Sequence, residues 1–159
     1  MTDRLTDIVD IIPAQPSHWP WICATFLEQV ALLPLTSRTA ASAQADALER
    51  VLRGGMCRAF SAVPQGFTDD LLGWSLGLDG ALIFAYVRDH LRRGGIGSQL
   101  MTAATDRIPI PVAYWTPEAE AMEAHGFPIH YDIHAFRALY AYVRCATRYQ
   151  HQHHAERIA

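Results

Sequence analysis

The first half of the chain changes between extended and helical hydrophobic patterns. Residues 7–14 have strand character and end at Pro13, whose missing N–H cannot extend a strand ladder. The next two segments, residues 17–33 and 40–53, instead repeat apolar side chains at steps of three and four. These steps place the apolar side chains on one face of a helix. The pattern therefore predicts one strand followed by two helices.

The middle of the chain is predicted to form three strands and a helix. Residues 56–63 and 71–78 alternate roughly between polar and apolar side chains, as antiparallel strands covered on one face do. Residues 81–87 are apolar throughout and follow the hairpin signal Asp79-Gly80, so this strand is expected to be buried on both faces. A glycine-rich turn then leads into residues 96–108, where every fourth residue is apolar.

The last part of the chain alternates short strands and helices. Residues 109–115 are predicted to form a strand, and a small helix is expected between an N-cap at Thr116 and an exit at Gly126. The β-like composition of residues 127–143 predicts two closing strands. The element order is then β-α-α-β-β-β-α-β-α-β-β. This order gives an α/β (α+β) fold, with a mixed, mostly antiparallel twisted sheet of roughly six or seven strands flanked by about four helices.

Length and composition fit one such domain. The chain has 159 residues, of which 50% are hydrophobic, and a formal net charge of −3, which does not indicate a nucleic-acid partner. A domain is expected over residues 1–145, followed by a frayed tail over 146–159. No stretch reaches the roughly 18 apolar residues of a membrane helix, and the acidic N-terminus does not resemble a signal peptide. A cytoplasmic protein without a membrane partner is therefore expected.

Cysteine and histidine positions indicate no metal site. The three cysteines, Cys23, Cys57 and Cys145, are odd in number and lack paired spacing. Histidines 151, 153 and 154 lie on the predicted frayed tail, where a metal site is not expected. Neither a disulfide framework nor a bound metal is predicted.

The stretch VRDHLRRGGIGSQLM, residues 87–101, carries the strongest functional signal. A helix that starts directly after a buried strand points its free N–H groups and the positive end of its dipole at whatever lies above the strand. Such a place binds phosphate well, and glycines leave the N–H groups uncovered while arginines add positive charge. The residues concerned are Gly94, Gly95 and Gly97, with Arg88, Arg92 and Arg93. A pyrophosphate is the expected ligand.

Two common phosphate-binding motifs are excluded by spacing. The stretch has no G-K-[ST], so it is not a P-loop, and its glycines do not form G-x-G-x-x-G in an N-terminal βαβ unit. A simple tight turn is the structural alternative for the glycines alone. The strand, the arginines and the helix that occur in register with them favour the phosphate site.

Arg92, Arg93, Gly94, Gly95, Ile96 and Gly97 resemble the acyl-CoA motif of the GCN5-related N-acetyltransferases (the GNAT superfamily), Q/R-x-x-G-x-G/A after a strand that ends in valine. The resemblance extends over residues 7–143, because the predicted order of elements is also that of the family. It implies that the loop wraps the pyrophosphate of acetyl-CoA and that the preceding strand offers backbone groups to the pantetheine arm. The residues implied at the cofactor are Tyr86, Val87, Arg88, Arg92, Arg93, Gly94, Gly95, Ile96, Gly97, Ser98 and Thr116.

The resemblance leaves the general acid open. Members of the family often take the proton for the leaving thiolate from a tyrosine on the small helix, where this chain has Met122. Tyr114 and His125 are the replacement candidates. Each has a structural alternative, since Tyr114 can be a core aromatic and His125 can interact with the dipole at the helix end.

The general base is open as well. Asp79 lies roughly where many members of the family carry a carboxylate, near the start of the strand that leads into the motif. The Asp-Gly hairpin turn explains Asp79 equally well. Asp89 and His90, in the loop before the glycines, are an alternative pair that could relay a proton through water.

The activity implied by the resemblance is an acetyl-CoA-dependent N-acetyltransferase, in which an amine attacks the thioester directly within a ternary complex. The acceptor is expected to be a small-molecule or peptide amine bound against residues 19–38. The alternative is a catalytically degenerate protein that keeps the acyl-CoA site and acts as a binding or interaction module, because of Met122. A homodimer would form if the apolar segment 138–143 paired as an exposed edge strand.

Overall fold

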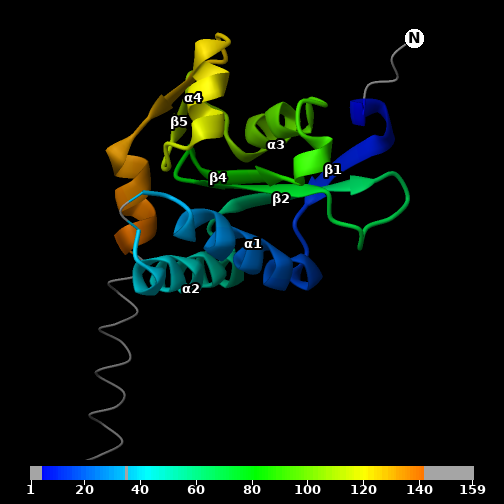
Figure 1. Cartoon of the computed structure of the whole chain (residues 1–159). Coiled ribbons are helices and arrows are strands. Elements are labelled where there is room, and N and C mark those ends of the chain that lie inside the picture. Colours follow the sequence, from blue (N-terminus) through cyan, green and yellow to red (C-terminus); the bar gives the residue numbers. More distant parts are fainter. Residues whose placement is uncertain (1–4, 35, 142–159) are drawn as a thin grey trace, which may run out of the picture.

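A six-stranded sheet separates two layers of helices in the computed structural model, which describes residues 5–34 and 36–141 (Figure 1). The strands lie in the sheet in the order in which they occur along the chain. They are β1 (Val9–Pro13), β2 (Arg58–Pro64), β3 (Gly73–Leu78), β4 (Ala81–Val87), β5 (Ile110–Val112) and β6 (Ile129–Tyr131). β1 to β4 pair antiparallel, whereas β5 runs parallel to β4 and β6 runs parallel to β5.

The helices connect these strands in the predicted order. They are α1 (Trp19–Ala31), α2 (Arg38–Gly54), α3 (Ile96–Ala104) and α4 (Pro117–Ala124), with short 3-10 turns η1 (Leu5–Ile8), η2 (Pro16–His18) and η3 (Asp89–Leu91). The α/β class and the mixed, mostly antiparallel sheet are confirmed, and the four predicted helices are present together with a fifth at residues 133–141. The predicted frayed tail, Cys145 and the tail histidines lie outside the described residues.

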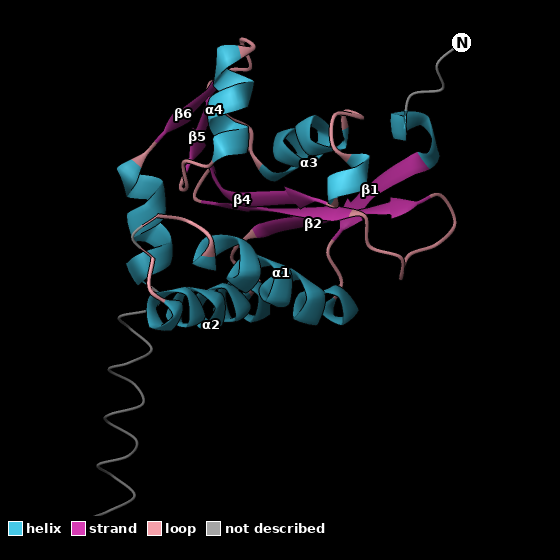
Figure 2. Cartoon of the chain, in the orientation of Figure 1, coloured by secondary structure: helices cyan, strands magenta, loops and turns pink. Residues whose placement is uncertain are grey.

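The two faces of the sheet are covered by different helices (Figures 1 and 2). α1 and α2 lie on one face, where the fully buried side chains of Phe26, Leu48 and Trp74 belong to the main core. α3 packs on the other face, where Ile96 and Leu100 are buried. α1, α2 and α3 therefore each bury most of the apolar stripe that the sequence spacing predicts.

Close contact between α3 and β3 depends on a glycine. A Cβ on Gly77 would lie 1.9 Å from the Ala104 carbonyl oxygen, so no larger residue fits there unless the helix moves. α3 ends at Ala104, and Ile108, which the sequence pattern places on the same helical face, is 80% exposed instead. The helix is thus one turn shorter than predicted.

The prediction of a second closing strand within residues 127–143 is wrong for residues 133–141. Residues 133–141 are helical and pack beside α2 and the end of β6 (Figure 2). The Asp132 carboxylate accepts a hydrogen bond from the His134 N–H at 2.8 Å, which caps the start of this helix. Ala135 and Leu139, four residues apart, are its buried positions. The predicted dimer contact rested on an extended segment at 138–143, so that argument no longer holds for residues 138–141.

No helix within residues 5–34 and 36–141 combines the length and the apolar character that crossing a bilayer requires.

Candidate functional site

The edge of β4 that faces β5 is unpaired over most of its length. The two strands meet at one register position, Leu82 opposite Val112, and the Ala113 N–H donates to the Leu82 carbonyl at 2.9 Å. β5 ends at Val112, whereas β4 continues to Val87. We call residues 83–87 on this side the open edge of β4. Within the described part of the chain, no strand pairs with it.

Alternation of the strand backbone determines which peptide groups face the open edge. The Arg88 N–H donates to the Leu72 carbonyl, on the β3 side, at 3.0 Å. Successive residues of a strand point their peptide groups to opposite sides. The N–H and C=O groups of Val87 and Ala85 therefore point to the open edge, whereas those of Tyr86 point to β3. Free backbone groups of this kind can bind the amides of an extended ligand.

Helix α3 begins beside the end of the open edge. Gly95 is its N-cap, with φ of 85°, a left-handed conformation that favours glycine. A Cβ on Gly97 would lie 3.7 Å from Val87 Cγ2, so the first turn of the helix packs against the end of β4. No described side chain caps α3, and its first backbone hydrogen bond runs from the Gln99 N–H to the Gly95 carbonyl. The N–H groups of residues 96–98 therefore point out of the helix without an acceptor among the described residues, and they can bind an anion.

The three arginines of the motif are held differently. The Arg88 Nε–H donates to the Leu71 carbonyl at 2.7 Å, and the Arg88 guanidinium lies 5.4 Å from the centre of the Trp21 ring. Arg92 is engaged by two carboxylates of the chain. Arg93 is exposed, has a left-handed φ of 69° and makes no hydrogen bond or ion pair with a described residue. Arg93 is thus the arginine of the motif that can meet an anion without breaking a contact.

Thr116 caps α4, on the other side of the open edge. Its hydroxyl accepts a hydrogen bond from the Ala119 N–H at 3.1 Å, and Pro117 occupies the first turn. The predicted N-cap is confirmed. Glu118 and Glu120 add two carboxylates to the first turn of this helix.

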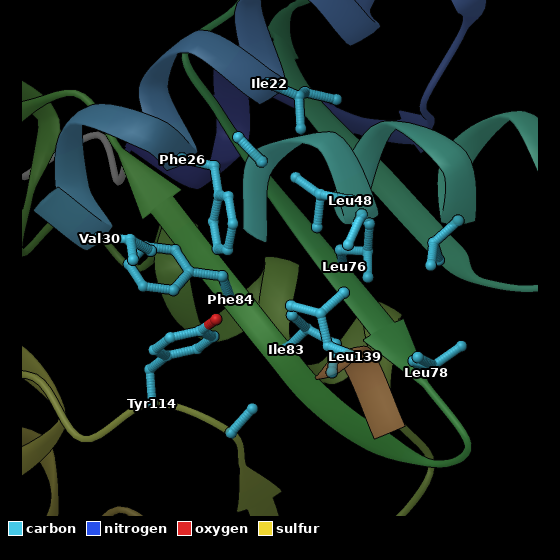
Figure 3. Packing of buried hydrophobic residues seen from close by; sticks show 14 of the residues in the cluster. Ile22, Phe26, Val30, Leu48, Leu76, Leu78, Ile83, Phe84, Tyr114 and Leu139 are labelled. Atoms are coloured by element: carbon cyan, nitrogen blue, oxygen red, sulfur yellow. The ribbon is translucent and has the colours of Figure 1, made fainter. Parts of the chain in front are cut away.

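Tyr114 lies in the apolar core rather than at a solvent-filled site. It is 8% exposed, and its hydroxyl donates to Gln44 Oε1. Three aromatic rings, those of Phe26, Phe84 and Phe136, lie around it with centroids 5.5 to 5.8 Å away. Figure 3 shows the Tyr114 ring turned into the same cluster as Phe84. Burial raises the pKa of Tyr114, so the hydroxyl keeps its proton at neutral pH.

The other acid and base candidates lie apart from the open edge. Asp79 is exposed, with φ of 53°, in the two-residue turn before β4. β4 spans about 20 Å between this turn and Val87. His125 is exposed at the C-terminal end of α4, where its ring Nδ1 lies 2.6 Å from the Ala121 carbonyl. Both positions match the structural alternatives, the hairpin turn and the helix end.

The position of Met122 faces a hydrophobic cluster. Met122 is half-buried and packs with Ile129, Ile110 and other residues between α4 and the sheet.

On the opposite face of β4, Tyr86 packs edge to face on Trp21, with ring centroids 5.7 Å apart. The Tyr86 hydroxyl makes no hydrogen bond to a described residue. Tyr86 therefore contributes a side chain to the α1 face, whereas its backbone is used within the sheet.

Ala85, Gln44 and Glu118 are parts of this region that sequence reasoning did not identify. Ala85 could have been found from the alternation of backbone groups along β4, which pairs it with Val87. Gln44 and Glu118 reach Tyr114 and Arg92 over separations of 70 and 26 residues, and no local pattern signals such contacts.

Comparisons with known proteins bear on the fold. No protein-family model and no curated protein matches the chain. A possible acetyltransferase from Clostridium difficile 630 is similar over 75% of this chain and 88% of that protein, with 11% identity and a TM-score of 0.50. An acetyltransferase from Thermus thermophilus aligns over 75% of this chain and 85% of its own, with 18% identity and a TM-score of 0.47.

A GCN5-related N-acetyltransferase from Rhodopseudomonas palustris is 19% identical over 60% of this chain, with a TM-score of 0.45, and this chain spans 62% of the length of that protein. The chain therefore shares the fold of the possible acetyltransferase from Clostridium difficile 630, in line with the acetyltransferase fold that the motif at residues 92–97 predicts. At these identities the similarity defines the fold and leaves the chemistry to the site itself.

Proposed function

We propose that the open edge of β4 and the start of α3 bind acetyl-CoA, and that the protein transfers the acetyl group to the amine of a small molecule or peptide. In the transfer the amine nitrogen attacks the thioester carbonyl carbon, the carbon–sulfur bond breaks, the nitrogen loses a proton and the thiolate gains one. The thioester supplies the activated acyl group. The chain supplies N–H donors for the diphosphate and a strand edge for the pantetheine amides.

One observation carries this proposal. Uncapped N–H groups of residues 96–98 lie against the end of a strand whose neighbouring backbone groups, at Val87 and Ala85, pair with no described strand on that side; the Val87 carbonyl accepts only from the Arg92 side chain. The first group suits an anion and the second suits an extended amide chain. Coenzyme A joins a diphosphate to such a chain. Thr116 and Ser98 border this region, at the starts of α4 and α3.

Two substitutions at Gly97 test the proposal. Gly97→Asp places a carboxylate at the start of α3, where it suits the helix dipole but repels a diphosphate. Gly97→Ala is the control, because its Cβ would make only an ordinary contact with Val87 at 3.7 Å. We expect calorimetric titration with acetyl-CoA to show binding for the wild type and Gly97→Ala, and at least about tenfold weaker binding for Gly97→Asp.

Thermal denaturation of the same proteins separates binding from folding. Both variants should melt at or above the wild-type temperature, because alanine and N-terminal aspartate each favour a helix over glycine. Equal affinity of Gly97→Asp and wild type for acetyl-CoA, or no binding by the wild type at millimolar ligand, would contradict the proposal.

A second candidate function is acyl-CoA binding without catalysis. The observation that favours it is the enclosure of the acid candidate, since the Tyr114 hydroxyl is buried against Gln44 and Met122 stands where a tyrosine is common. Coenzyme A release can be followed by mass spectrometry over a panel of amines, polyamines, aminoglycosides and peptides. Product formation with any acceptor favours the transferase, whereas tight binding of acetyl-CoA without product over the whole panel favours the binding protein.

Mass spectrometry is preferred to a thiol reagent in this assay because the chain has cysteines of its own. Burial, with a contribution from Glu49, raises the pKa of Cys23 to about 11, so this thiol would react with such a reagent slowly and give a drifting background during the assay. Burial also raises the pKa of Cys57. All 13 basic residues counted as Lys or Arg are arginine, so acetylation of a lysine of the protein itself cannot be mistaken for product.

A further inference from the structure

Arg92 connects the two segments that border the open edge, the loop after β4 and the start of α4. It follows β4, whereas its partner Glu118 lies in the first turn of α4, which follows β5. The Arg92 Nη1–H donates to Glu118 Oε1 at 2.9 Å. The two residues are 26 positions apart in the sequence. Among the ion pairs of the described residues, this one joins the loop after β4 to α4.

The remaining donors of Arg92 are also occupied by the chain. Its Nη2 lies 2.8 Å from Asp89 Oδ1, and its Nε–H donates to the Val87 carbonyl at 3.2 Å. One guanidinium thus faces two carboxylates, and it uses a backbone carbonyl that points to the open edge. A diphosphate that approached α3 would find this arginine already neutralised.

The ion pair between Arg92 and Glu118 opposes the binding of an anion at the start of α3 rather than supporting it. Glu118 and Asp89 are anions that already pair with the Arg92 guanidinium, so a diphosphate must compete with them for it. Both carboxylates are largely exposed, with relative side-chain accessibilities of 55% and 84%, so each can turn to solvent at little cost. The Arg92 side chain, at 34%, is free to turn between partners in the same way.

We propose that Glu118 sets the affinity of this site for its diphosphate ligand by competing for Arg92. In the free protein Arg92 is held across the open edge by Glu118, Asp89 and the Val87 carbonyl. When the diphosphate binds, Arg92 exchanges Glu118 for phosphate oxygens, and the Val87 carbonyl becomes available to the pantetheine amides. Arg93, which has no partner among the described residues, makes the first contact with the ligand. This inference rests on the proposed function, since the ligand is the same.

The test compares Glu118→Gln with Glu120→Gln. Both residues lie in the first turn of α4 and each substitution removes one negative charge, but only Glu118 contacts Arg92. Calorimetric titration with coenzyme A should show about three- to tenfold tighter binding for Glu118→Gln and less than about a twofold change for Glu120→Gln. Pantetheine, which lacks the diphosphate, should bind both variants as it binds the wild type.

A double-mutant cycle shows whether Glu118 acts through Arg92. In an Arg92→Gln background, Glu118→Gln should change coenzyme A affinity no more than Glu120→Gln does, because no guanidinium remains to be released. Asp89→Asn removes the second carboxylate that pairs with Arg92. In the protein that keeps Arg92, this substitution should also tighten coenzyme A binding. Circular dichroism checks that each variant keeps the fold.

The outcomes distinguish this inference from the proposed function. If the wild type binds no coenzyme A, the proposed function is wrong. If the wild type binds and Glu118→Gln binds equally or more weakly, the competition is wrong and Glu118 instead leaves the site unaffected or orients Arg92 for the ligand. An equal gain from Glu118→Gln and Glu120→Gln, or a gain that persists without Arg92, also overturns it.

Discussion

Among single residues, a side chain that the sequence predicts to be catalytic can instead lie in the packed core. Tyr114 was considered as a proton donor because it ends the strand beside the cofactor strand. In the structure its ring lies among aromatic side chains, and its hydroxyl donates a hydrogen bond to Gln44, which is itself buried. A buried hydrogen-bonded pair of this kind stabilises the core only while both partners are present.

Removing the Tyr114 hydroxyl should therefore lower stability. Tyr114→Phe leaves the Gln44 carbonyl without its donor, and we expect a loss of about 1–2 kcal/mol in the free energy of unfolding at pH 8, measured by urea denaturation. The double variant Tyr114→Phe with Gln44→Leu should recover part of this loss, since neither polar group remains. A stable double variant that binds acetyl-CoA but has lost turnover would instead show that the hydroxyl takes part in the reaction.

The stability difference between wild type and Tyr114→Phe should depend on pH. An unfolded tyrosine ionises near pH 10, whereas burial raises the pKa of folded Tyr114 above that value. Above about pH 10 the unfolded state therefore binds fewer protons, and the contribution of this tyrosine to stability falls as the pH rises. The difference between the two proteins should be full at pH 8 and smaller at pH 11. A constant difference across this range would contradict the assigned burial effect.

At the scale of elements, periodicity predicted most helices and strands but not the last one. Residues 22–30 and 41–52 carry spacings of three and four, and both became helices of the main core. The β-like composition of residues 127–143 predicts two closing strands, of which β6 (Ile129–Tyr131) is present, whereas residues 133–141 are helical. The signal that decides against a strand is Asp132 as an N-cap together with Ala135 and Leu139 one turn apart.

The position of α3 over β3 is set by a glycine, and this gives a test of the element packing. Gly77→Ala would place a Cβ 1.9 Å from the Ala104 carbonyl oxygen. We expect a loss of about 2–3 kcal/mol in the free energy of unfolding, because the helix must shift away from the sheet. The control is Gly54→Ala, at the end of α2, where the nearest atom beyond its own neighbours is Met56 Cε at 3.8 Å. It should change stability by less than about 1 kcal/mol.

Equal stabilities of Gly77→Ala and Gly54→Ala in urea denaturation would show that α3 does not approach β3 as described. If the helix shifts, the N–H groups at its start shift as well, so weaker coenzyme A binding should accompany the loss of stability in Gly77→Ala.

Across the whole molecule, the sequence motif predicted the strand, the glycine turn and the helix that form the proposed phosphate site. Strand β4, the glycine turn and α3 are local in sequence, so their order and spacing could be read without the structure. Which backbone groups stay unpaired depends on where β5 stops, after a crossing helix, and that is a property of the folded sheet. Sequence spacing does not decide whether Tyr114, His125 and Asp79 act in chemistry, because each fills a structural position that spacing does not distinguish from a chemical one.

A groove beside β1 is an alternative location for a ligand. This groove of about 570 Å³ lies between β1, β2 and α3, lined by residues that include Ile11, Phe60 and Ser98. Its lining residues include Ser98 and Gln99 of the first turn of α3 together with residues of β1 and β2, and none of residues 83–87. A ligand bound in this groove would therefore meet the first turn of α3 from the β1 side, but it would not meet the backbone groups of Val87.

A crystal structure of the protein with coenzyme A would show whether the ligand lies at the open edge of β4. We expect diphosphate oxygens within about 3 Å of the N–H groups of residues 96–98, and pantetheine amides within the same distance of the Ala85 and Val87 backbone. Arg92 should be turned from Glu118 toward phosphate. Coenzyme A seated in the groove beside β1, or bound with the N–H groups at the start of α3 still free, would show that the open edge and these N–H groups are not its site.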